Sequence, residues 1–176
     1  RRVLFRSDLD GNGFPDVIIG SAGTGEVHAY LNTAGVFSGP FLLFDTIGAS
    51  NGPNTVTVAD FDGDGLLDII AGGASDGEIA LWKGDGTGNS AGSFSFVGVV
   101  HDFDTHASAD SYDVDGDGDQ DLVAVARASG DVLFLEGNGD GTFQSPVTLG
   151  SVTPSAFGMA GPPRLSPTHL PSQTLL

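Results

Sequence analysis

Short apolar runs, separated by turns rich in glycine and aspartate, make up most of this chain. The runs favour β-branched side chains and are bounded by Gly or Asp, which is typical of β-strands. No apolar pattern with the period of a helix occurs along the sequence. The clearest runs, each of which follows an acidic turn, are 16–20, 68–72 and 121–126. The pattern therefore predicts an all-β fold.

The predicted strands recur in a unit of about fifty residues. The acidic turns begin at residues 8, 60 and 113, so their spacings are 52 and 53 residues. A second strand follows each of the runs above, behind a Gly-acid step, at 26–31, 78–83 and 131–136. A weaker third strand is predicted at 41–44, 96–100 and 146–149. The strand that leads into the next acidic turn is clear at 55–59 and weaker at 107–112. Four short antiparallel strands per unit indicate a β-propeller fragment of about three four-stranded blades.

The acidic turns carry oxygen-bearing side chains at alternate positions. Side chains at positions 1, 3, 5 and 9 and the backbone carbonyl at position 7 can converge on one point, a cage for a cation with about six to eight oxygen ligands. Calcium tolerates the irregular geometry of such a cage better than magnesium does. In Asp loop 1 (8–16, DLDGNGFPD) the predicted ligands are Asp8, Asp10, Asn12, the carbonyl of Phe14, and Asp16. In Asp loop 2 (60–68, DFDGDGLLD) they are Asp60, Asp62, Asp64, the carbonyl of Leu66, and Asp68. In Asp loop 3 (113–121, DVDGDGDQD) they are Asp113, Asp115, Asp117, the carbonyl of Asp119, and Asp121.

Two other structures could contain loops of this composition. A helix–loop–helix calcium hand places a glutamate at position 12 and continues into a helix. Position 12 here is Ile19, Ala71 or Ala124, inside an apolar run, so the pattern predicts a calcium loop between strands. The alternative is a solvated Asp/Gly turn without an ion. That turn would crowd several carboxylates together, and each close pair costs about 4 kcal/mol at an effective dielectric of about 20.

The composition is strongly acidic, with 6 Lys+Arg, 23 Asp+Glu and a formal charge of −17. Eleven of the acids are predicted side-chain ligands, and three calcium ions would bring the net charge to about −11. Such a charge argues against nucleic acid as a partner and against binding to an anionic membrane surface. The chain has no cysteine and no run of about eighteen apolar residues, so it offers no disulfide and no sign of membrane insertion.

Both ends of the chain depart from the repeat. Residues 1–7, RRVLFRS, correspond to a translated sequencing adapter, so they are expected to be an artefact that replaces the first strand of blade 1. The Pro/Ser/Thr-rich tail is expected to be disordered or frameshifted, with a genuine linker as the alternative. The expected divisions are blade 1 at 8–53, blade 2 at 54–105, blade 3 at 106–150, the start of a fourth blade at 151–160, and the tail at 161–176.

The three loops, together with GNGDGTF at 137–143, resemble FG-GAP/VCBS repeats, the blades of integrin-α-type β-propellers. The resemblance covers about 8–160. It implies a propeller of seven blades in many members, an extracellular setting, and one structural calcium ion in the loop between the first two strands of each blade, hence about three ions here. A ring normally needs about four to eight blades. The remaining blades of a parent chain are therefore expected partners.

The expected function is that of a non-catalytic, calcium-binding propeller segment of a secreted or cell-surface protein, which serves adhesion or recognition of a protein or glycan ligand. The alternative is an accessory or catalytic propeller of an extracellular carbohydrate-active enzyme. No serine lies in a motif that places it beside a base. The irregular polar cluster at 101–106, HDFDTH, is interpreted as a surface loop, in a connection where propellers often bind ligands. Tyr30, Trp82 and Leu135 hold equivalent positions and are expected to pack between blades, with a sugar-stacking platform as the alternative.

Overall fold

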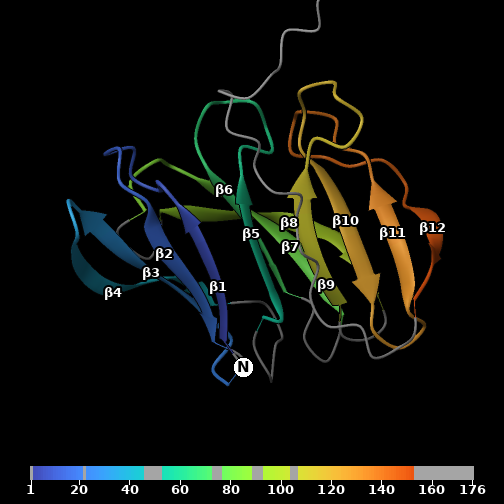
Figure 1. Cartoon of the computed structure of the whole chain (residues 1–176), viewed down its shortest axis with the longest axis horizontal. Coiled ribbons are helices and arrows are strands. Elements are labelled where there is room, and N and C mark those ends of the chain that lie inside the picture. Colours follow the sequence, from blue (N-terminus) through green and yellow to red (C-terminus); the bar gives the residue numbers. More distant parts are fainter. Residues whose placement is uncertain are drawn as a thin grey trace, which may run out of the picture.

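The computed structural model describes residues 2–21, 23–45, 53–72, 77–88, 93–103 and 107–152, which form three four-stranded antiparallel sheets (Figure 1). The first sheet contains β1 (Arg2–Ser7), β2 (Asp16–Ser21), β3 (Glu26–Thr33) and β4 (Val36–Asp45). The second contains β5 (Thr55–Ala59), β6 (Asp68–Gly72), β7 (Glu78–Gly84) and β8 (Phe94–Asp102). The third contains β9 (Ala107–Tyr112), β10 (Asp121–Ala126), β11 (Asp131–Leu135) and β12 (Val147–Ser151). The predicted all-β fold with propeller-type blades is confirmed. In these residues no helix is long and apolar enough to cross a membrane.

The strands of each sheet follow one another in chain order, as expected for a blade. Residues 2–7, which the sequence analysis set apart from blade 1, form β1 and pair with β2 from Arg2 opposite Ser21 to Ser7 opposite Asp16. A ladder of backbone hydrogen bonds can form with almost any side chains, so this pairing leaves the expected origin of the segment untested. The expected fourth-blade start and the tail lie outside the described residues.

The last strands of the first two sheets are longer than predicted. β4 and β8 cover Val36–Asp45 and Phe94–Asp102, whereas the apolar pattern predicted 41–44 and 96–100. Residues 36–40 are exposed, and the register of both strands shifts along the ladder. Bulges and exposure remove the alternation of apolar and polar residues on which the prediction depended.

The three sheets pack face to face, with the second sheet in the middle (Figure 1). Every residue of its strand β6 is buried. One core cluster joins the first two sheets and includes Ile18, Val27 and Trp82, and the other joins the second and third sheets. Trp82 is 3% exposed and its ring stacks on Phe44 with centroids 4.3 Å apart. Trp82 therefore packs between sheets, as expected, whereas Tyr30 is half-buried on the outer face of the first sheet.

The second and third sheets are also joined through their first strands. The hydroxyl of Thr55 donates to the carbonyl of Ala109 at 2.6 Å and accepts from the Ala109 N–H at 3.1 Å. The hydroxyl of Thr57 lies 2.8 Å from that of Ser111. The turns that follow β1, β5 and β9 all lie at the same edge of the stack, at the top in Figure 1. The fold therefore gathers the three Asp loops along one edge.

Candidate metal centres

Each Asp loop turns sharply at its glycines. The position 6 glycines Gly13, Gly65 and Gly118 have φ angles of 89°, 85° and 103°. Position 4 is also glycine in every loop, and there too φ is positive, at 70°, 72° and 85°. A residue with a Cβ is strained at such angles. The two left-handed glycines fold the loop back on itself, so that its acidic side chains face inward.

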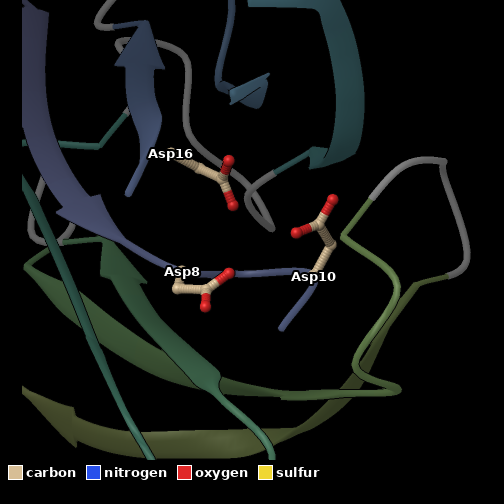
Figure 2. A group of neighbouring side chains, drawn as sticks. All are labelled: Asp8, Asp10 and Asp16. Atoms are coloured by element: carbon tan, nitrogen blue, oxygen red, sulfur yellow. The ribbon is translucent and has the colours of Figure 1, made fainter. Parts of the chain in front are cut away.

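Carboxylates at positions 1, 3 and 9 converge in all three loops. In each loop one oxygen from each of the three side chains lies within 4.8 Å of the others. Figure 2 shows the group in loop 1, where the carboxyl groups face a common space. The three groups are Asp8, Asp10 and Asp16; Asp60, Asp62 and Asp68; and Asp113, Asp115 and Asp121. Each group could hold a metal ion.

The closing aspartate at position 9 is also part of the backbone scaffold. In loop 2 the carboxylate of Asp68 accepts the N–H of Phe61 at 3.0 Å and that of Gly84, at the end of β7, at 2.9 Å. All three closing aspartates are 0% exposed, and Asp16 and Asp121 make the same pair of bonds to their own loops and to Asn32 or Gly137. These donors are not among the residues that the loop spacing predicts. In the sequence, the donor outside each loop could be recognised as the Asn or Gly that lies 16 residues after the closing Asp.

Two of the position 5 side chains, Asp64 and Asp117, are not part of the converging groups. In loop 2, Oδ1 of Asp64 accepts the N–H of Leu66 at 2.8 Å, and Asn12 and Asp117 make the equivalent bond to position 7. This bond holds the N–H of the position 7 residue, whose own carbonyl, in the next peptide unit, is a predicted ligand in every loop. Whether positions 5 and 7 ligate an ion stays a prediction.

The electrostatics of the loops favour a bound cation. Burial raises the pKa of the Asp16 and Asp68 carboxyl groups, and nearby loop carboxylates add to this effect, against the backbone N–H donors that lower it. Burial also raises the pKa of Asp119, followed by repulsion from the other acids of loop 3. A cation among these groups would offset both burial and repulsion. The donor set of each group is carboxylate oxygen, which suits a hard divalent cation such as calcium rather than zinc or copper.

A second feature is a cleft of about 360 Å³ between the second and third sheets. Its lining includes His101 and Asp102 at the end of β8 and Phe103 directly after it, together with Ser129 from the turn before β11 and Asp131 at the start of β11. The rings of His101 and Phe103 meet edge to face with centroids 4.5 Å apart. The remaining residues of the predicted polar cluster, 104–106, lie outside the described residues.

Comparison with known proteins adds two findings. Three overlapping stretches, residues 8–71, 60–124 and 113–162, match the FG-GAP-like repeat. Among solved structures the chain is similar to a lectin from Agrocybe aegerita, described as specifically recognising non-reducing terminal N-acetylglucosamine. The identity is 28%, the TM-score is 0.60, and the match covers 86% of this chain but 39% of that chain. Among curated proteins no sequence matches significantly.

Proposed function

Because this chain belongs to the FG-GAP-like repeat family, we propose that it is a calcium-stabilised segment of a β-propeller that binds a glycan. The observation that carries the calcium assignment is repetition: the same three-carboxylate group occurs in all three sheets. An isolated acidic turn is common on protein surfaces. Three loops that agree in spacing, in glycine conformation and in the burial of the closing aspartate support a common ligand.

Calcium in these loops acts on stability. Calcium loops of extracellular modules have dissociation constants of about 10⁻⁴ to 10⁻³ M, so such loops fill outside cells and stay empty at cytosolic calcium levels. We therefore place the parent protein outside the cell, as a secreted or cell-surface protein. A site held at about 100 times its Kd adds about 2.7 kcal/mol to the free energy of unfolding. The first turn of chain to lose order without calcium is expected to be an Asp loop.

The glycan assignment is supported by the likeness to a lectin, a class of binding proteins without catalysis. The cleft beside His101 combines aromatic rings with a few carboxylate and hydroxyl groups. This combination is typical of binding sites for small polar ligands. A net charge of −17 disfavours phosphate-bearing ligands such as nucleic acids. A neutral sugar is not repelled by this charge.

The test combines thermal melts with glycan binding, on the full chain in calcium and in EDTA. Each filled site should raise the melting temperature by about 5 to 10 °C, since 1 kcal/mol corresponds to about 2 to 4 °C in a chain of this size. Immobilised glycans that end in N-acetylglucosamine should retain the chain in calcium, and the free sugar should compete. The variant His101→Ala should lose at least about tenfold in glycan affinity. His28→Ala, which removes a histidine from the outer face of the first sheet, is the matched control.

The two parts of the proposal can fail separately. A folded chain that binds no calcium would rule out the metal assignment. Calcium-dependent stabilisation without glycan retention would keep the metal assignment and remove the glycan. Equal losses in the two histidine variants would mean that the sugar does not use the cleft beside His101.

A further inference from the structure

Lys83 is the only lysine in the chain, and its ammonium group lies on Asp loop 2. Nζ contacts Oδ2 of Asp62 and lies 3.0 Å from Oδ2 of Asp64. Asp62 belongs to the converging group of this loop, and Asp64 is its position 5 residue. The protein's own cation is therefore bound to two carboxylates that the sequence predicts as calcium ligands.

The end of β7 holds Lys83 beside the loop. The next residue, Gly84, donates its N–H to Asp68 at 2.9 Å, and a Cβ at Gly84 would lie 2.1 Å from the carbonyl oxygen of Leu67. Loop and strand thus meet through closely packed backbone. The Lys83 side chain is 44% exposed, so its flexible stem can carry the ammonium away without a change in the backbone.

The three sheets differ in charge at this position. The residue 15 places after the closing aspartate is Leu31, Lys83 or Glu136. Loop 1 has three acids, loop 2 has four acids opposed by Lys83, and loop 3 has five, so the formal charges are −3, −3 and −5. Lys83 forms ion pairs with two acids of loop 2, Asp62 and Asp64. Loop 2 therefore has the same predicted side-chain ligands as loop 3, but it also has a cation of its own.

We propose that Lys83 is a built-in counter-ion of Asp loop 2, which competes with calcium for Asp62 and Asp64. The inference rests on the proposed calcium function of the loops. Calcium has to displace the ammonium, so loop 2 binds calcium more weakly than its four aspartates alone would. Loop 3, with the most acids, fills first. When calcium is too scarce to fill loop 2, Lys83 offsets part of the repulsion among its carboxylates, which helps to keep the middle sheet ordered.

The first test is calorimetric titration of the full chain with calcium. The wild type should show one tighter site and two weaker ones. Lys83→Gln should show two tighter sites and one weaker one, because removing a charge this close to the ligands should tighten one site by about tenfold or more. Lys83→Arg keeps the charge and should behave as the wild type. Arg127→Gln removes an equal charge from the turn after β10 and should leave all three affinities unchanged within about twofold.

A second measurement needs no variant. Because Lys83 is the single lysine, reductive methylation with ¹³C-formaldehyde labels its amine, apart from the chain's N-terminus, and keeps its charge. The dimethyl-lysine resonance should stay fixed while the tightest site fills and then shift as loop 2 fills. A resonance that stays fixed while three ions bind would overturn the proposal.

The outcomes separate the two assignments. If calcium binds but Lys83→Gln and Arg127→Gln give the same affinities, Lys83 is not a competitor, although the calcium function stands. If no loop of the folded wild type or of the folded Lys83→Gln variant binds calcium, the calcium function fails and this inference fails with it.

Discussion

At the scale of single residues, the closing aspartates stabilise their loops through hydrogen bonds that need no bound ion. Asp68 is fully buried, yet both of its oxygens accept backbone N–H groups, one from Phe61 in the loop and one from Gly84 in the sheet. A carboxylate oxygen has two lone pairs, so these bonds leave room for a metal. The loop is thus held in a form in which its carboxylates converge, which would lower the entropy lost on binding a metal ion.

Replacing Asp68 by Asn should therefore destabilise the protein even without calcium. The new amide group cannot accept one of the two buried N–H groups, so the free energy of unfolding in EDTA should fall by about 2 kcal/mol or more. Urea denaturation measures the change. Asp45→Asn, the same substitution at an exposed position at the end of β4, should change stability by less than about 0.5 kcal/mol. Equal effects of the two variants would mean that the paired N–H bonds contribute nothing.

At the scale of elements, the turn of one sheet covers the Asp loop of the sheet before it. The turn between β11 and β12 reaches loop 2, where Gly141 donates its N–H to the carbonyl of Phe61 at 2.9 Å. The rings of Phe61 and Phe143 lie 5.9 Å apart. The turn after β7 reaches loop 1, since a Cβ at Gly88 would approach the side chain of Leu9 to 2.8 Å. The Asp loops and the packing between sheets are therefore physically coupled.

Loop 3 differs from loops 1 and 2 in the exposure of its position 2 side chain. Its residue Val114 holds the position of Leu9 and Phe61, which are 3% and 2% exposed, yet Val114 is 53% exposed. The contact that buries this position thus comes from the following sheet.

Weakening this cover should lower the stability of the neighbouring sheet. Phe143→Ala removes the ring that meets Phe61 and should reduce the free energy of unfolding by about 1 to 2 kcal/mol, as expected for a partly buried aromatic pair. Thermal melts in calcium measure the loss. Phe37→Ala, at a position that is 54% exposed, is the matched control and should have little effect. If the two variants have the same melting temperature, the turn does not stabilise loop 2.

At the scale of the whole molecule, the middle sheet is covered on both faces and its neighbours on one. Strand β6 is buried throughout, whereas burial alternates along β2, where Ile18 is 0% exposed and Ile19 is half-buried. On the third sheet the outer face carries the half-buried side chains of Val123, Val125 and Phe134. An apolar face of this kind is suited to packing against a further sheet.

The chain should accordingly self-associate through this face in calcium. Light scattering after size-exclusion chromatography should give a mass that rises with concentration, and Val123→Glu should shift the chain toward monomer because a charge cannot be buried there without a partner. Val97→Glu makes the same substitution at a position on β8 that is 55% exposed, and it serves as the control. A wild type that stays monomeric at all concentrations would contradict the prediction.

The amino-acid sequence by itself determined the all-β fold, the repeat and the three Asp loops. These features are local, because alternation along a strand and the 1-3-5-9 spacing of acids involve residues within one short segment. Prediction from the local pattern was wrong about the ends of β4 and β8, because bulges and exposed residues interrupt the alternation of apolar and polar residues there. Whether the position 5 side chain, which accepts the N–H of the position 7 residue, also ligates an ion stays a prediction.

Only the tertiary structure decided what each local feature contacts. Ile18 and Ile19 are the same residue type side by side, and the stacking of sheets alone makes one of them core and leaves the other on an outer face. The bond from Asp68 to Gly84 and the contact of Lys83 with loop 2 join residues 16 and 21 positions apart. The cover of Phe61 comes from a different sheet. Such contacts depend on how strands return and how sheets stack, which the alternation within one strand does not specify.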